Sequence, residues 1–92
     1  MHASEISTTL DVVNDLGLHL RAAGILVQRA SQYRSELFLS KGTLRANAKS
    51  IMSVLSLAAS KGTKLTLTAQ GEDAQQAINA IAKLFNEGFV EL

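Results

Sequence analysis

Cysteine and proline are absent from the 92-residue sequence, and aromatic residues make up only 4% of it. Without cysteine the chain has no disulfide framework, no thiolate metal site and no cysteine nucleophile. Without proline, the boundaries between elements must be marked by glycine and small polar residues. Because tryptophan is also missing, the core must be built from Leu, Ile, Val and Ala, which fits the 47% hydrophobic content of an ordinary globular domain.

The sequence also lacks a strong charge excess and long apolar runs. Nine basic and eight acidic residues leave a net charge of +1, which provides no electrostatic footprint for nucleic acid. No apolar run is long enough to span a membrane, and the opening MHASEIST lacks the regions of a signal peptide. We therefore expect a soluble cytoplasmic protein, folded as one domain over residues 1–92, with no nucleic-acid or membrane partner.

Nucleotide-binding and metal-binding motifs are missing as well. Neither GxxxxGK[ST] nor GxGxxG occurs, and the two histidines, His2 and His19, do not have the spacing of metal ligands. We therefore predict no cofactor and no metal. His2, close to the terminus, belongs to no partner pattern.

Hydrophobic periodicity predicts four strands and three helices. The strands are expected at residues 6–12, 35–40, 43–48 and 63–69, and the helices at 20–32, 51–59 and 74 to a stop at Gly88. Ser50 is the expected N-cap of the second helix, and Asp73 with Gln76 forms a variant capping box before the third. This β-α-β-β-α-β-α order predicts an α+β fold, an open-faced two-layer sandwich with three helices on one face of a four-stranded, mainly antiparallel sheet.

The stretch GLHLRAAG, residues 17–24, places a histidine and an arginine where a loop turns into a predicted helix. The first N–H groups of a helix have no acceptor within the helix and carry a partial positive charge, which suits a phosphate. His19 at the N-cap offers a nucleophilic ring nitrogen, and Arg21 adds a planar cation for phosphate oxygens. These residues predict a reversible phosphoryl acceptor. On the residues alone, two alternatives stay open: a histidine that only caps the helix, and activation of water by Asp15.

A second stretch, residues 48–62, is apolar on nearly all sides of a short predicted helix. Ile51, Met52 and Leu55 lie on that surface, either as part of the core or as an exposed docking patch. Ser50 is either an N-cap alone or also a modification site, because a phosphate there would face a helix N-terminus.

The two stretches together resemble a known family. GLHLRAA at 17–23 matches the pattern G-[IL]-H-x-R-[PA]-A, and KSIM at 49–52 matches a signature in which serine opens a short helix. With both motifs at the expected separation, and with a likeness over about residues 5–90, the chain is similar to the HPr phosphocarrier proteins of the bacterial phosphotransferase system. The resemblance implies an HPr-like open-faced sandwich.

The resemblance also implies a histidine phosphocarrier, which is a co-substrate in phosphotransfer rather than a stand-alone catalyst. His19 would accept a phosphoryl group at Nδ1 from enzyme I, charged by phosphoenolpyruvate, and would donate it to an EIIA-type protein. Arg21 and the first amides of the helix would hold the phosphate oxygens. A monomer is expected. Both partners would dock on one surface formed by Leu20, Ile51, Met52 and Leu55.

Ser50 matches the serine that HPr kinase/phosphorylase modifies in many bacteria, whereas in others no such kinase acts. An alternative function is therefore a regulatory binding module controlled by phosphorylation at Ser50. Family members that work only in this way lack the histidine, which this chain carries as His19. An RNA-binding α/β domain would need exposed aromatic residues and a basic face, and the sequence indicates neither.

The sequence departs from the sugar-transport branch of the family at Ala22, where those members usually carry proline. The nitrogen-related branch, NPr, includes members with alanine there. NDLGLH at 14–19 and AKLFNEGFVEL at 82–92 resemble motifs of that branch. The resemblance therefore favours the nitrogen-related branch, and it leaves the downstream acceptor and the regulated process open.

Overall fold

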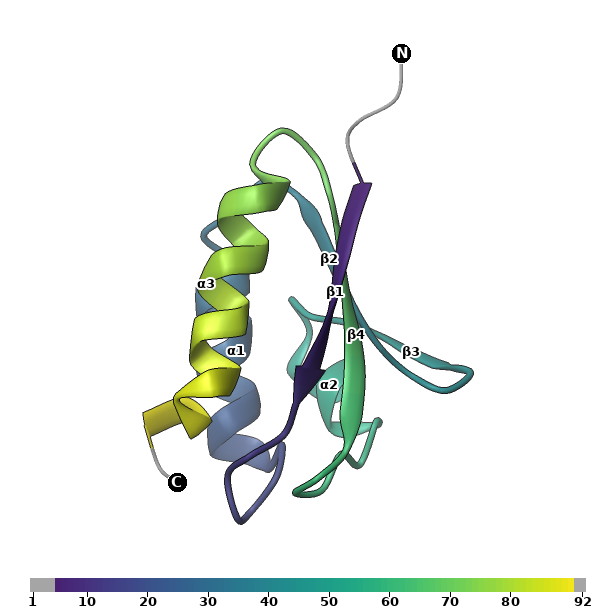
Figure 1. The fold of residues 1–92 in the computed structure, drawn as a ribbon, viewed down its shortest axis with the longest axis vertical. Coiled ribbons are helices and arrows are strands. Elements are labelled where there is room, and N and C mark those ends of the chain that lie inside the picture. The colour runs from purple at the N-terminus through teal and green to yellow at the C-terminus, as the bar shows by residue number, and fades with distance from the viewer. Residues whose placement is uncertain (1–4, 91–92) are drawn as a thin grey trace.

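The computed structural model describes residues 5–90, which form one sheet with helices packed on one of its faces (Figure 1). The predicted α+β class and element order are confirmed. His2 and the last two residues of the 82–92 motif lie outside the described residues. The strands are β1 (Glu5–Asp11), β2 (Glu36–Lys41), β3 (Leu44–Asn47) and β4 (Lys64–Gln70). The helices are α1 (Leu20–Ala30), α2 (Ile51–Leu55) and α3 (Ala74–Asn86), followed by a short 3₁₀ turn, η1 (Gly88–Val90).

The strands form one sheet in the order β1-β4-β2-β3, and every pairing in it is antiparallel. β4 is central, because it pairs with β1 on one side and with β2 on the other. The alternation that predicted the strands decides which face is covered. Leu39 and Leu67 are paired across β2 and β4 and are fully buried, whereas Thr66 and Thr9 point to solvent.

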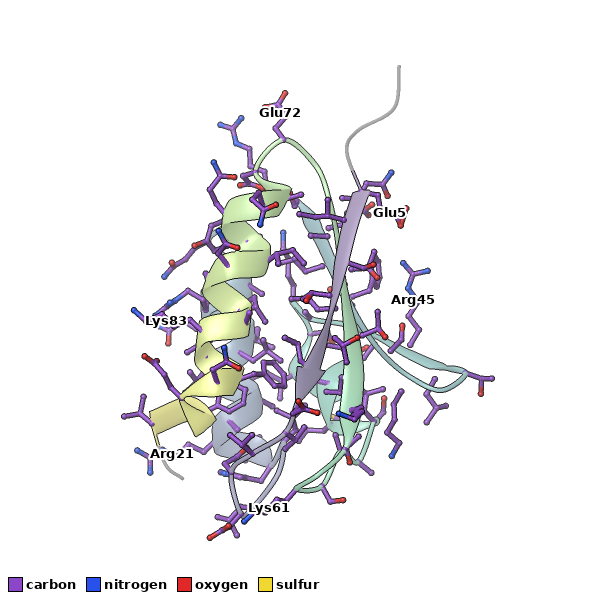
Figure 2. All side chains as sticks on the ribbon, viewed as in Figure 1. Glu5, Arg21, Arg45, Lys61, Glu72 and Lys83 are labelled. Atoms are coloured by element: carbon purple, nitrogen blue, oxygen red, sulfur yellow. The ribbon has the colours of Figure 1, made fainter. Side chains whose placement is uncertain are left out.

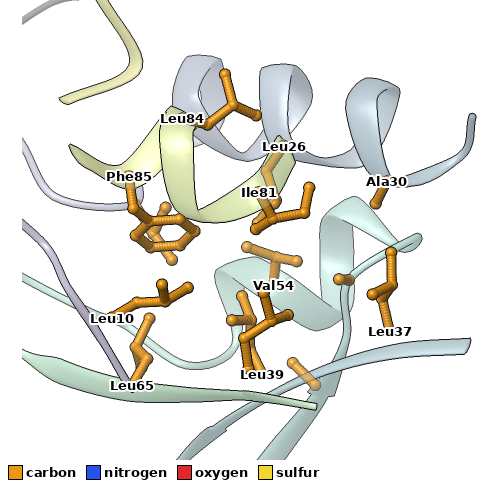
Figure 3. Close-up of a cluster of buried hydrophobic side chains, with 14 of the residues drawn as sticks. Leu10, Leu26, Ala30, Leu37, Leu39, Val54, Leu65, Ile81, Leu84 and Phe85 are labelled. Carbon is orange, nitrogen blue, oxygen red and sulfur yellow. The ribbon is translucent and has the colours of Figure 1, made fainter. Parts of the chain in front are cut away.

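The core lies between the helices and the sheet, and each helix contributes to it (Figure 3). Leu26 of α1, Val54 of α2 and Ile81 of α3 have no exposed surface. Full burial of an aliphatic side chain of this size stabilises a fold by about 1.5–3 kcal/mol relative to exposure. The helices are therefore held in place by the same apolar stripes that predicted them, and the beginnings of α1 and α2 are held with them.

The second helix is shorter than the sequence pattern predicts. α2 has five residues, whereas the apolar run predicted a helix over 51–59. Ala58 adopts a left-handed conformation with φ 48°, which ends the helical path, while its neighbours Leu57 and Ala59 are buried. The run stays apolar past the end of the helix because the turn itself is part of the core.

The predicted capping box at the third helix is wrong. Asp73 is the N-cap of α3, but its side chain caps none of the helix N–H groups. Its carboxylate instead accepts hydrogen bonds from the Ser35 hydroxyl at 2.5 Å and from the backbone N–H groups of Arg34 and Ser35 at 2.8 and 2.9 Å. These donors, the Ser35 hydroxyl first, lower the pKa of Asp73 to about 2. The carboxylate therefore links two loops that a local motif could not have brought together.

Candidate functional site

His19 is the N-cap residue of α1, as predicted. Its Nδ1 accepts a hydrogen bond from the backbone N–H of Arg21, with 3.2 Å between the nitrogens. A ring nitrogen that accepts a hydrogen bond carries a lone pair, so the lone pair of Nδ1 points at the opening of the helix. Capping and phosphoryl acceptance therefore involve the same nitrogen, and the geometry is compatible with both interpretations of His19.

The helix opening presents backbone N–H groups next to the His19 ring. Ala23 donates to the carbonyl of His19 at 2.9 Å and begins the intrahelical ladder. The N–H groups of Leu20, Arg21 and Ala22 precede that bond and lie at the positive end of the helix. An anionic group attached to Nδ1 would thus lie against donors that the helix leaves without carbonyl partners.

Arg21 has an exposed side chain at the same end of the molecule as Lys61, and Glu72 lies at the opposite end (Figure 2). Within residues 5–90, no carboxylate forms an ion pair with its guanidinium. Because the side chain is exposed, it contributes little to the core. The site therefore combines a helix N-terminus with a cation close to it in sequence.

The loop before His19 is closed by hydrogen bonds between its two ends. Asn14 is buried and donates from Nδ2 to the Gly17 carbonyl at 2.7 Å, while the Gly17 N–H donates to the Asn14 carbonyl at 3.1 Å. Asp15 forms an ion pair with Lys61 at 2.7 Å. The hydrogen bond from Lys61 lowers the pKa of Asp15, which makes its carboxylate a weaker base for activating water.

The loop before His19 rests on the turn that follows α2. The Leu18 N–H donates to the Ala59 carbonyl at 2.9 Å. Gly17 has φ +67°, and a Cβ on it would lie 2.5 Å from the Ala59 carbonyl oxygen and 2.9 Å from Cα of Ser60. Only glycine combines this backbone conformation with so close an approach, so the glycine of the motif is required by a contact with residues distant in sequence.

The predicted docking residues differ in how far they reach solvent. Leu20 is 65% exposed, Met52 78% and Ile51 37%, and the helices that carry them, α1 and α2, pack against each other. Leu55 is only partly buried but packs against the core, so less of it is available. The sequence reading missed Leu16, which is 73% exposed in the loop before Gly17. An apolar residue inside a predicted turn was the signal that could have identified it.

Ser50 caps α2, as predicted. Its hydroxyl accepts a hydrogen bond from the Ser53 N–H at 3.3 Å, and the side chain is half-buried. Asn47 organises the approach to the helix: its carbonyl accepts from the Ser50 N–H and its side-chain oxygen from the Lys49 N–H. The Asn47 N–H in turn donates to the Ser53 hydroxyl at 2.8 Å. The serine is therefore held in a fixed position at the start of the helix.

The described part of the chain holds neither a cluster of metal-ligating side chains nor a helix that could cross a membrane. Across residues 5–90, no three histidine, cysteine or carboxylate side chains gather as metal ligands would. Over the same range, no helix has both the length and the apolar character needed to cross a bilayer.

Comparisons with known proteins match nearly the whole chain. A family model described as the PTS HPr component phosphorylation site matches residues 6–87. The phosphocarrier protein HPr of Neisseria meningitidis is 41% identical over 86 residues, which cover 94% of this chain and 97% of the relative. The HPr-like protein Crh of Bacillus subtilis is 48% identical over 71 residues, covering 77% of this chain and 84% of the relative. A crystal structure of HPr from Thermoanaerobacter tengcongensis has a TM-score of 0.91 at 38% identity and covers 95% of this chain and 98% of that one.

Proposed function

The chain belongs to the HPr family of phosphocarrier proteins, and on that premise we propose that His19 is the residue that carries the phosphoryl group. It is a phosphocarrier of the phosphotransferase system, a co-substrate that takes a phosphoryl group from enzyme I and passes it to an EIIA-type protein. The observation that supports His19 best is the orientation of Nδ1, which faces the opening of α1 and accepts from the Arg21 N–H.

The proposed transfer is an exchange of one bond to phosphorus for another. The Nδ1 lone pair of His19 forms a bond to phosphorus as the bond between phosphorus and enzyme I breaks, and the same exchange then passes the group to the EIIA-type acceptor. In the phosphorylated state, the Arg21 N–H that now donates to Nδ1 turns to a phosphate oxygen. Arg21 contributes its guanidinium to the same oxygens.

Ala22 supports assignment to the nitrogen-related branch, because it replaces the proline usual in the sugar-transport branch. It lies in the first turn of α1, where a proline would be tolerated. Alanine retains a backbone N–H there, next to the amide that faces Nδ1. The chain thus offers one more donor in the first turn than a proline-containing sequence would, and we propose that this donor contributes to holding the phosphate.

For docking, we propose a surface centred on Leu20, Ile51 and Met52, with a smaller contribution from Leu55. The first three are exposed apolar residues on two helices that pack together, and Leu20 directly follows His19. Exposed apolar groups beside a reacting residue are suited to a partner that must dock and leave again. A partner bound there would also exclude water from the phosphoryl group during transfer.

A second function at Ser50 is supported by its place as the N-cap of α2 and by its match to the serine that the family's kinase modifies in many bacteria. We propose that an HPr kinase/phosphorylase, where one is present, modifies the Ser50 hydroxyl at the start of α2. The phosphate would place negative charge beside exposed Ile51 and Met52. Ser50→Asp should therefore weaken binding to enzyme I; unchanged affinity in a titration would remove Ser50 from this role.

The test of the main proposal uses the two histidines of the chain. Incubation with phosphoenolpyruvate and enzyme I should give an acid-labile phosphoprotein. His19→Ala should abolish the label, and the matched control His2→Ala should retain it. Label that persists in folded His19→Ala would show that the acceptor is another residue.

We also propose that residues 1–92 form a single HPr-like domain that acts as a monomer in the cytoplasm. The HPr relative from Neisseria meningitidis is covered to 97% of its length, and the HPr structure from Thermoanaerobacter tengcongensis to 98%. Sedimentation equilibrium of the purified protein tests the monomer, with a mass of 9.8 kDa expected and twice that mass contradicting it.

A further inference from the structure

Lys41, the last residue of β2, reaches across to the turn that follows α2. Its ammonium Nζ donates to the Leu57 carbonyl at 2.7 Å and lies 3.4 Å from the Ala58 carbonyl. These two carbonyls lie in the turn, two and three residues beyond the last residue of α2. The lysine gives them a cationic hydrogen-bond donor, and its contact with the Leu57 carbonyl is partly buried.

The turn that Lys41 contacts has a demanding conformation. Ala58 has φ 48°, a region that costs an alanine about 1 kcal/mol or more. Such a conformation persists only where surrounding contacts hold it. Leu57 and Ala59 on either side are buried, and Lys41 binds the carbonyls of Leu57 and Ala58. The lysine is therefore one of the groups that hold the turn in place.

The next residue along that turn supports the loop that carries His19. The Ala59 carbonyl accepts from the Leu18 N–H at 2.9 Å, and Gly17 is packed against the same carbonyl. Leu18 directly precedes His19, whose Nδ1 accepts a hydrogen bond from the Arg21 N–H at the helix opening. Three successive carbonyls, those of Leu57, Ala58 and Ala59, thus connect a lysine on the sheet to the backbone before the phosphoacceptor.

We propose that Lys41 is a positioning residue for phosphoryl transfer, which holds the turn after α2 so that the loop before His19 keeps its reactive geometry. This inference rests on the proposed role of His19. Lys41 does not touch the phosphoryl group in this scheme, and it acts only through Ala59 and Leu18. Displacement of a reacting group by about 1 Å can slow a reaction up to a hundredfold, so loss of one of several supports should give a smaller effect.

The experiment compares three variants with the wild type in phosphoryl transfer from enzyme I. Lys41→Met keeps the aliphatic stem and removes the ammonium, Lys41→Arg restores a cationic donor, and Lys64→Met removes one exposed positive charge elsewhere. Lys41→Met should lower kcat about three- to tenfold with KM changed by less than about twofold. It should also shift the Leu18 amide resonance and speed its exchange with solvent. Lys41→Arg should recover most of the rate, and Lys64→Met should match the wild type.

Several outcomes would overturn the inference. The first is a Lys41→Met variant with unchanged kcat and an unchanged Leu18 amide resonance. The second is a fall in kcat of Lys64→Met as large as that of Lys41→Met. The third is a Lys41→Met variant in which KM rises while kcat stays the same. If Lys41→Met and Lys41→Arg both fail to fold, the lysine supports the whole domain and not the loop. Failure of the proposed function is distinguishable, because the wild type would then carry no label on His19 while the Leu18 resonance would still report on Lys41.

Discussion

Replacing Gly17 by alanine tests the contact on which the geometry of the site depends. Gly17 has φ +67°, and an added Cβ would lie 2.5 Å from the Ala59 carbonyl oxygen. The substitution should lower the free energy of unfolding for two separate reasons. Holding an alanine in the left-handed region costs about 1–2 kcal/mol, and forcing its methyl group against fixed backbone costs about 1–3 kcal/mol more.

Gly42 provides a matched control for the first of these costs. It has φ +59°, and nothing lies within 4 Å of the position that a Cβ would take. The free energy of unfolding of Gly42→Ala should therefore fall only by the cost of the left-handed conformation, about 1–2 kcal/mol. That of Gly17→Ala should fall by about 2–5 kcal/mol. For a domain of this size each kcal/mol lowers Tm by about 4–8 °C. The two variants should thus differ by about 4 °C or more in Tm.

Thermal and urea unfolding of the two variants measure this difference, and the phosphorylation rate of His19 measures its effect on the site. We expect Gly17→Ala to be both less stable and slower to accept phosphate than Gly42→Ala. Equal stability losses in the two variants would refute the close approach of Gly17 to Ala59. A full-rate phosphorylation of Gly17→Ala would refute the dependence of the site on that approach.

Three further substitutions test other parts of the structure. Gly24→Ala should raise the free energy of unfolding by about 0.5–1 kcal/mol, because Gly24 lies inside α1 with nothing within 4 Å of its missing Cβ; a loss of stability on urea unfolding would contradict this. Asp73 has a pKa of about 2 in the fold, against an ordinary value of 3.8. Its carboxylate therefore stabilises the fold fully above pH 3.8, and this stabilisation is lost as the pH falls through about 2. The urea midpoints of wild type and Asp73→Asn should therefore differ at neutral pH and converge near pH 2; a gap that is unchanged in acid would contradict it. Met52→Ala should raise KM for enzyme I about fivefold and leave Tm unchanged, and a fall in Tm with unchanged KM would make Met52 a packing residue instead.

Local patterns in the sequence were sufficient to predict the fold and the N-cap position of His19, the proposed phosphoacceptor. Alternation such as Leu65 with Leu67, and stripes such as Ala23, Leu26 and Ala30, predicted faces that are buried in the structure. His19 was predicted as an N-cap because a glycine-containing loop and a helical period meet there, and both signals lie within a few residues.

Features that depend on contacts between distant segments could not be predicted in this way. The carboxylate of Asp73 turns away from its own helix because donors from Arg34 and Ser35 compete for it. The end of α2 was misjudged because apolar residues in a buried turn resemble a continuing helix. The hydrogen bond from the Leu18 N–H to the Ala59 carbonyl joins two loops, and the hydrophobic periodicity of a single segment cannot predict such a contact.

The strand order has a consequence for how the protein is made. β4 is the central strand of the sheet but the last strand in the chain, and β1 pairs with it along its full length. On a translating ribosome the segment with His19 emerges long before Ala59 and β4, because domains close only when their distant partners have been synthesised. A nascent chain thus exposes the histidine before the loop geometry exists. The loop geometry around His19 can therefore form only after the chain as far as β4 has been synthesised.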